Sequence, residues 1–327
     1  MILLLLAVIL FTSIYTIQVV WNHHCFRTYA LDYGFYNQAI WDFAHFRSNT
    51  NTILEPPLPN YFQVHPGFTL IWILPLYWIF YPLFGSYTLL IIQNIFIIAG
   101  GLATYALIRR KTNDRWIALL AFLHFNLIWG HYSALAADYI DTTIASSLVP
   151  LFILMFDKRK YFAATVVFLF VITCKENMPI WLFFISAALF FIYRERPSRI
   201  ASLGFGFFSI IYFIFIFTVL IPYFEDPHRP YGFFQYSALG DNPAKAVLYI
   251  LKHPGASLKM LFENHLNDPN LKGIKLEFHT VFMLSGGLLL IRRPVYFLMF
   301  IPVIAQKMYN DSFVRWGILG FYSIEAV

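Results

Sequence analysis

The segment TCKENMP, residues 173–179, places two charged side chains inside an apolar run. Lys175 and Glu176 follow YFAATVVFLFVI and precede IWLFFISAALFFIY. Charged groups at such a position need a polar cavity or partners, which makes them candidates for function. A lysine offsets the charge of a phosphate, and a glutamate keeps that lysine charged or ligates a divalent cation. The alternative for Glu176 is a plain surface ion pair with Lys175.

Two segments near the N-terminus offer further titratable groups. In ALDYGFYNQAIWDF, residues 30–43, Asp32 comes before a helix-like aromatic stretch, and in VHPGF, residues 64–68, His65 precedes a proline and a glycine. An ionised aspartate near water can act as a base or hold a divalent cation. The alternative for Asp32 is an N-cap of an interfacial helix, because aspartate is favoured at helix starts.

A third segment, HYSALAADYID at residues 131–141, carries His131, Asp138 and Asp141. Helical spacing would put all three side chains on one face if the segment continues as a helix. For Asp141 alone we favour a helix cap, because it directly precedes an apolar run.

These groups need a scaffold, and the composition indicates which kind. Of the 327 residues, 59% are hydrophobic and only 12% are charged, with a mean hydropathy of +0.64. Soluble domains are far more polar. Repeated apolar runs match the roughly 20 residues that a helix needs to cross a bilayer. The sequence therefore predicts an all-α integral membrane protein, a multi-pass bundle of about 9–10 spans. It forms a single transmembrane domain over residues 1–327, with the lipid bilayer as its partner.

Clusters of Lys and Arg at the ends of apolar runs set the expected orientation. The positive-inside rule places such clusters in the cytoplasm, which puts the N-terminus there too and most acids on the external or periplasmic face of the cell inner membrane. Basic residues scattered over span ends do not indicate nucleic-acid binding. The clusters are 109–115, 157–160, 194–199 and 292–294. The expected spans are 1–20, 86–108, 116–131, 142–156, 161–174, 178–193, 200–222, 277–291, 295–307 and a tenth from Trp316.

Some regions depart from this regular pattern. An external loop is expected at residues 21–66. The run GFTLIWILPLYWIFYPLF at 67–84 is predicted to be interfacial or re-entrant, because two prolines interrupt it and a full crossing would reverse the charge pattern. A full span is the alternative. A second external loop, 223–276, is predicted to hold two short helices divided at Pro254. The last apolar segment reaches Val327 soon after it begins, so we expect the final span to be incomplete.

The order of these features resembles the GT-C superfamily of integral membrane glycosyltransferases. The chain begins with a first span, followed by a loop with an early acid. An HPGF segment then leads into a proline-broken run, and the next span ends in RRK. More narrowly, the chain is similar to an uncharacterised prokaryotic family of predicted membrane proteins assigned to that superfamily. The motifs that carry this resemblance are LDYGFYNQAIWD (31–42), VHPGF (64–68), CKENMPIW (174–181), YSALGDNPAKAVLYILKHP (236–254) and FYSIEA (321–326).

The resemblance implies a sugar donor linked to a polyprenyl phosphate or diphosphate and used at the external face. It matches Asp32 to the catalytic acid that these enzymes carry in the first external loop. Lys175 would offset the charge of the departing phosphate, and Glu176 would keep Lys175 charged. The site residues should then line one cavity at the outer membrane boundary. The candidate substrate-binding residues are His65, Asp138, Asp141, Arg315 and Tyr322.

Two departures from the family pattern bear on this assignment. The chain reads AADYID where the family tends to carry a His-Pro-Glu-like step, which removes support for a role of Asp138. KEN replaces a more acidic KED, which weakens a metal site. Asp32 and Glu176 are the candidate ligands for Mg²⁺ or Mn²⁺, because these ions prefer oxygen. The sequence leaves metal dependence, the sugar and the acceptor open.

Two other classes of function stay open. A transporter or lipid flippase would need polar or ionisable groups near the bilayer midplane and paired broken helices. Only His124, Gln93 and Asn94 qualify, and His124 is expected to hydrogen-bond to a neighbouring helix. A non-catalytic scaffolding protein would use the loop 223–276 as a docking surface.

Overall fold

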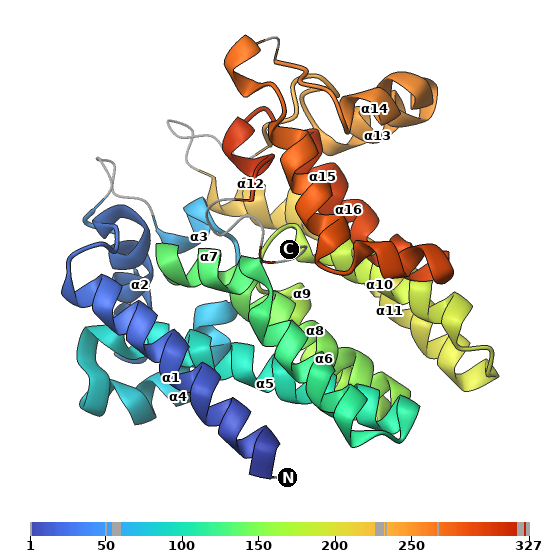
Figure 1. Cartoon of the computed structure of the whole chain (residues 1–327). Helices are drawn as coiled ribbons and strands as arrows, with labels where there is room; N and C mark the ends of the chain where they lie inside the picture. Colours follow the sequence, from blue (N-terminus) through green and yellow to red (C-terminus); the bar gives the residue numbers. More distant parts are fainter. Residues whose placement is uncertain are drawn as a thin grey trace.

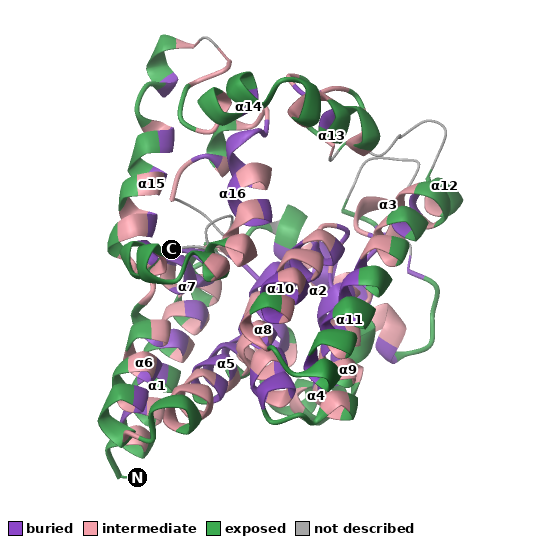
Figure 2. Cartoon of the chain, turned by 90° about the vertical axis from the view of Figure 1, so that its right-hand side faces the viewer, coloured by how far each residue is buried: buried purple, intermediate pink, exposed green. Residues whose placement is uncertain are grey.

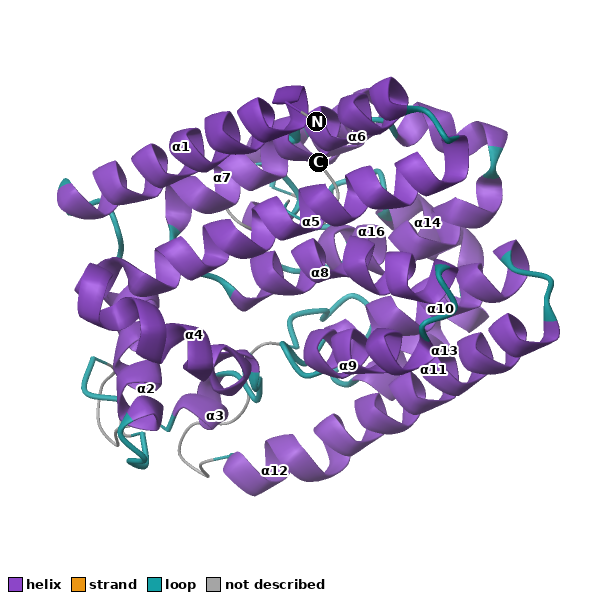
Figure 3. Ribbon diagram, turned by 90° about the horizontal axis from the view of Figure 1, so that it is seen from below, coloured by secondary structure: helices purple, strands orange, loops and turns teal. Residues whose placement is uncertain are grey.

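A computed structural model describes residues 2–49, 51–53, 60–225, 232, 234–266, 268–318 and 324. Within this part of the chain every regular element is helical, and no strand is present (Figure 3). The predicted fold class, a helical membrane protein, is confirmed. Among the described residues, four helical stretches are long and apolar enough to cross a membrane, and several shorter apolar helices accompany them. The number of about 9–10 spans stays a prediction.

The helices follow one another with short connections. The four membrane-length stretches are Ile2–His24, Thr69–Thr112, Arg115–Ala137 and Arg196–Phe224, and the shorter apolar ones are Tyr161–Ile172, Met178–Ile192 and Pro294–Met308. The α-helices are α1 Ile2–His24, α2 Phe35–Ala44, α3 Tyr61–Val64, α4 Thr69–Phe84, α5 Thr88–Thr112, α6 Arg115–Leu127, α7 Trp129–Ala137, α8 Asp141–Asp157, α9 Tyr161–Ile172, α10 Met178–Ile192, α11 Arg196–Phe215, α12 Ile221–Phe224, α13 Pro243–Lys252, α14 Pro254–Met260, α15 Ile274–Leu284 and α16 Ile301–Met308. Two π-helical turns are η1 Ala30–Gly34 and η3 Ile216–Leu220, and the 3₁₀ segments are η2 Gly85–Tyr87, η4 Pro269–Leu271, η5 Gly287–Arg292, η6 Pro294–Phe300 and η7 Phe313–Arg315.

The centre of the bundle is the packing of α5 between α6, α8 and α1 (Figure 1). Gly100 of α5 permits its closest approach to α8, because a Cβ at this position would lie 2.5 Å from the Ser147 carbonyl oxygen. Small residues have this role wherever membrane helices pack backbone to backbone. Figure 2 shows buried residues on the inner faces of α5, α8 and α10, and exposed ones along the outer faces of α1 and α11.

One end of this bundle gathers three of the basic loops, and we call it the basic end. The Asp157 carboxylate accepts hydrogen bonds from Arg110, at 2.7 Å, and from Lys111. It also accepts one from the Tyr193 hydroxyl at 2.5 Å. The clusters 109–115, 157–160 and 194–199 therefore meet, as an even number of crossings between them requires. Which side of the membrane they face stays a prediction.

The opposite end carries Asp32, Asp138 and Asp141, and we call it the acidic end. Helix α4 begins and finishes at this end. Its start is held by the bond from Thr69 Oγ1 to the Cys174 carbonyl, at 3.2 Å, and just past its last residue Ser86 hydrogen-bonds to His23 at 3.1 Å. Both ends of this 16-residue helix thus lie at the acidic end, so the helix lies across that end and does not run to the basic end. Its placement relative to the membrane stays a prediction.

The C-terminal part differs most from the expected spans. The expected span 277–291 is interrupted, because α15 ends at Leu284 and Gly286 adopts a φ of +124° before the chain continues as 3₁₀ helix. Trp316, where a tenth span was expected to begin, is fully buried just after the 3₁₀ turn η7, and residues 316–318 are not helical. Apart from residue 324, the rest of that expected span lies outside the described residues. In the loop 223–276, α13 and α14 are the two short helices, and α14 begins at Pro254.

The orientation can be tested with single cysteines. Cys25 is exposed and Cys174 is buried, so a Cys25→Ser protein should show little maleimide labelling of its own. A cysteine in place of Leu31, which is 55% exposed at the acidic end, is expected to react with an impermeant maleimide in intact cells. One in place of Lys158 at the basic end should react only after permeabilisation. Labelling of the Lys158 variant alone in intact cells would reverse the orientation.

Candidate functional site

The HPGF segment lies directly on the TCKEN turn, although a hundred residues of sequence separate them. The Phe68 amide donates a hydrogen bond to the Thr173 carbonyl at 2.7 Å. Gly67 makes this approach possible, because a Cβ there would lie 2.2 Å from the Cys174 carbonyl oxygen. Any larger residue at 67 would separate the two segments. The pairing brings His65 over the charged turn.

The other side of the turn is anchored on α16. Asn177 Nδ2 and Trp181 Nε1 both donate to the side-chain oxygen of Gln306, at 2.9 and 3.1 Å. The Tyr236 hydroxyl donates to the Gln306 backbone carbonyl at 3.2 Å. The turn therefore lies between the N-terminal loop and the C-terminal part of the chain. Gln306 is a positioning residue that no sequence pattern indicated.

Lys175, at the tip of this turn, is half-buried. Its positive charge is close enough to lower the pKa values of Asp32, His65 and Asp141. Among the residues that the structure describes, none forms a hydrogen bond or ion pair with the Lys175 ammonium group. Its charge is therefore balanced through space and not by direct contact, so an anion can approach it.

Asp32 lies in the π-helical turn η1, which leads directly into α2. Single π turns are rare and are frequent at functional sites. Asp32 is an exposed residue with a partly desolvated carboxylate. This carboxylate caps neither η1 nor α2, so the alternative of an N-cap is wrong. Burial of its surroundings raises the pKa of Asp32, and the Lys175 charge partly opposes that rise. The Tyr33 hydroxyl fixes the turn by donating to the Ser86 carbonyl.

Asp138 does not continue the preceding helix. Helix α7 ends at Ala137 and Asp138 is extended, so the expected single helix face with His131 and Asp141 is wrong. Gln93 stabilises this break in the helix: its side-chain amide donates to the Asp138 carbonyl, and its side-chain oxygen accepts from the Ile140 amide. Burial, together with the Asp32 charge, raises the pKa of Asp138 to about 7, although the Tyr29 amide donates to its carboxylate at 3.1 Å and opposes the rise.

Asp141 is the first residue of α8, but it is not the cap of that helix. Its two carboxylate oxygens accept hydrogen bonds from the Tyr61 and Tyr139 hydroxyls, each at 3.0 Å. Burial raises its pKa to about 6, while Lys175 and the tyrosines lower it. Asp141 is therefore a buried partner of the cluster, held by tyrosines that the sequence did not single out.

His65, Glu176 and Arg315 form the remaining part of the cluster. The His65 Nδ1 atom lies 4.0 Å from Glu176 Oε2. Burial lowers the pKa of His65 well below its usual value, and Lys175 and Arg315 lower it further, so His65 is neutral at physiological pH. Arg315 and Glu176 both act on the pKa of Tyr236, which burial raises. The Lys175 neighbourhood thus includes a second cation.

Tyr322, a predicted site residue, is outside the residues that the structure describes. Two histidines lie away from this cluster. His131 packs against the rings of Tyr15 and Phe125 inside the bundle. His124 bonds to the Ser285 carbonyl at 2.9 Å, which confirms its expected link to a neighbouring helix.

A metal centre has limited support in this geometry. Within the described residues no group of three or more His, Cys, Asp and Glu side chains is placed to hold a metal ion. Asp32 and Glu176, the candidate ligands, associate with different partners, Lys175 and His65 respectively. The pair Asp32 and Glu176 as metal ligands stays a prediction, and we derive no chemical step through a metal.

The raised pKa values of Asp138 and Asp141 predict a pH dependence of stability. Each folded pKa exceeds the ordinary value of 3.8, so the stabilisation is complete below about pH 4 and is lost as pH rises to about 7. Thermal unfolding in detergent should occur a few degrees lower at pH 7.5 than at pH 5. Asp138→Asn should reduce this difference, whereas Asp241→Asn, at an exposed carboxylate, should not. An unchanged difference in Asp138→Asn would contradict the assignment.

The family comparison agrees with the membrane architecture. A family model described as "Predicted membrane protein (DUF2079)" matches residues 22–327. No curated protein and no solved structure matches the chain.

Proposed function

The chain belongs to this family of predicted membrane proteins, and we propose that it is a glycosyltransferase of the GT-C type. Its donor is a sugar on a polyprenyl phosphate or diphosphate, and its acceptor is bound at the acidic end, on the external face of the membrane. The family description extends only to a membrane protein. Support for the activity comes from the side chains at the acidic end.

The observation that carries this proposal is that Lys175 and Asp32 lie close enough to interact electrostatically without forming an ion pair. A half-buried ammonium group without a described ion pair lies within electrostatic reach of an exposed carboxylate on another element. A structural ion pair would bring the two groups into contact and leave neither accessible. Separate, oppositely charged groups instead suit a reaction in which one end of the substrate is anionic and the other loses a proton.

The chemistry assigned to each group is simple. The acceptor hydroxyl oxygen forms a bond to the anomeric carbon of the sugar, and the bond from that carbon to the phosphate oxygen breaks. Asp32 takes the acceptor proton, and the electron pair leaves with the phosphate. Lys175 stabilises the negative charge that develops on the phosphate, and Arg315 adds to the positive field. A carboxylate with a raised pKa, as for Asp32, is a better base than an ordinary aspartate.

The apolar part of a lipid-linked donor has a matching surface. Helix α12 stacks Phe224 on Phe62 of α3, with ring centroids 5.1 Å apart, next to the His65 segment. On the outer side of the same region Tyr223 and Val219 are 79% and 49% exposed. An isoprenoid chain lying along this exposed side would keep the donor in the membrane while its phosphate reaches the acidic end.

The transporter alternative receives less support. Gln93 is engaged by the backbone around Asp138, and His124 by the Ser285 carbonyl. Of the three candidate groups, Gln93 thus has structural partners and His124 is exposed, which leaves Asn94, a buried amide without a hydrogen-bond partner among the described residues. One such amide is less than the set of ionisable groups that a transport pathway needs. The scaffolding alternative is decided by an activity assay.

The experiment is to incubate the purified protein in nanodiscs with polyprenyl monophosphate and diphosphate donors that carry radiolabelled sugars. Release or transfer of the sugar from at least one donor is expected, and it should be lost in the double variant Asp32→Asn/Lys175→Met. Tight binding of a donor without any turnover would point to a lipid-sugar carrier. Neither binding nor turnover across both donor classes would favour the scaffolding function.

A further inference from the structure

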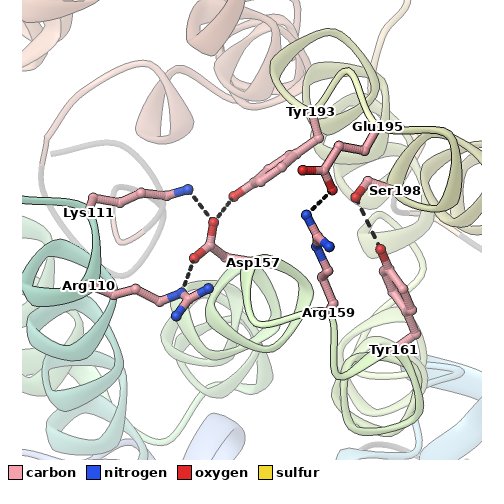
Figure 4. A network of polar contacts seen from close by, with 8 residues as sticks. All are labelled: Arg110, Lys111, Asp157, Arg159, Tyr161, Tyr193, Glu195 and Ser198. Atoms are coloured by element: carbon pink, nitrogen blue, oxygen red, sulfur yellow. Dashed lines mark hydrogen bonds and ion pairs between the residues drawn. The ribbon is translucent and has the colours of Figure 1, made fainter.

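The basic end holds a polar pocket that the proposed reaction does not use. Its volume is about 420 Å³, and charged or hydroxyl-bearing side chains make up its lining (Figure 4). Three interhelical loops contribute to it, so it exists only in the folded bundle. The lining residues are Arg110, Lys111, Asp157, Arg159, Tyr193, Glu195 and Ser198.

Asp157 is the fixed centre of one wall. Its side chain is only 3% exposed and is bound by Arg110, Lys111 and the Tyr193 hydroxyl. Burial alone would raise the pKa of Asp157, but these hydrogen bonds outweigh it and lower the pKa, so the carboxylate stays charged. Two cations share this one carboxylate, which leaves an excess positive charge on the wall. Arg110 contacts Asp157 through Nε, so its terminal nitrogens point past the carboxylate.

The opposite wall carries Arg159, paired with Glu195. Both side chains are largely exposed, at 62% and 50%, so this pair is weak and can exchange partners. Arginine binds phosphate oxygens through its planar fork of donors. Three cations and two carboxylates thus face one pocket, and one of those cations is held only loosely.

The position of the pocket indicates which phosphate reaches it. Large apolar side chains are exposed within three residues of its lining: Phe162 is 86% exposed and Phe191 and Ile200 are each 59% exposed. Such side chains face acyl chains in a membrane protein, and headgroups lie next to them. Basic pockets between membrane helices bind anionic headgroups. We infer that this pocket binds the phosphodiester of an anionic phospholipid in the adjacent leaflet.

The test measures retention of single lipids by native mass spectrometry, with phosphatidylglycerol compared with phosphatidylcholine. The sample contains about 0.5 M salt, which screens diffuse attraction to a few ångströms. The wild type should retain phosphatidylglycerol preferentially. Arg159→Gln should weaken this retention about tenfold, the scale of one hydrogen bond to a charged group. Lys160→Gln removes an equal charge from the same loop but does not line the pocket, and should change retention less than about twofold.

Glu195→Gln provides an independent test in the opposite direction. It removes the carboxylate that competes for Arg159, so phosphatidylglycerol should bind more tightly, and thermal unfolding checks that every variant is folded. Equal losses in Arg159→Gln and Lys160→Gln would reduce the effect to general basic charge and overturn the site. Stabilisation by inorganic phosphate in neutral lipid, equal to that by phosphatidylglycerol, would assign the pocket to a free phosphate and overturn the lipid assignment.

Discussion

Replacing Asp32 with Asn is expected to lower sugar transfer by about two orders of magnitude or more, the scale of losing a general base. The amide has nearly the same shape as the carboxylate, and the exposed position of Asp32 in η1 means that no packing is lost. Donor binding should be largely preserved, because the donor phosphate interacts with Lys175. The measurement is donor binding and transfer, taken separately in one nanodisc preparation.

The matched control is Asp42→Asn, which makes the same chemical change in α2. The Asp42 carboxylate accepts a hydrogen bond from Asn49 at 2.8 Å and stabilises the loop rather than the charged cluster. This variant should retain transfer within a few-fold of the parent. Full transfer by Asp32→Asn would remove Asp32 from the reaction, and equal losses in both variants would assign the effect to the loop fold.

The sequence predicted the general architecture because charge and hydropathy act over whole segments. Basic clusters must avoid the hydrocarbon, so 109–115, 157–160 and 194–199 converge on one end, where Asp157 joins them. Local breaks in the helices could not be predicted from the sequence in the same way. The break at Asp138 depends on Gln93, and the interruption of 277–291 depends on the conformation of Gly286. Neither leaves a periodic signal in hydropathy.

The charged residues of the candidate site could be predicted from the sequence, but the residues that hydrogen-bond to them and position them could not. Lys175 was indicated because charged residues are costly within apolar runs, and Asp32 because the resemblance matched it to a catalytic acid, whereas Asp141 was expected to be a helix cap. Tyr61 and Tyr139, which bind Asp141, occur among many other aromatic residues and carried no distinguishing pattern. Gln306 lies in the C-terminal part and meets the TCKEN turn only through tertiary structure. Partners of this kind are set by the way segments fold together, which spacing within one segment does not report.

Replacing Lys175 with Met is expected to weaken donor binding by about ten- to a hundredfold, the range for a hydrogen bond to a charged group. Methionine keeps an apolar stem of similar length, so the packing of the TCKEN turn is retained while the cation is removed. Transfer should fall further than binding, because the phosphate gains negative charge in the transition state. Lys175→Arg preserves the charge and should recover part of the affinity. Lys245→Met is the control, since it removes an exposed lysine that pairs with Asp241.

A pH profile separates this role from a structural one. Lys175 lowers the pKa of Asp32 against the effect of burial, so removing the cation should raise that pKa. Transfer requires the ionised carboxylate and increases with pH through its pKa, so the acidic limb of the profile should move to higher pH in Lys175→Met. Lys245→Met should leave the limb in place. A Lys175→Met protein that binds donor like the parent and keeps its profile would show that the charges of the TCKEN turn are structural, and the scaffolding function would then account better for the fold.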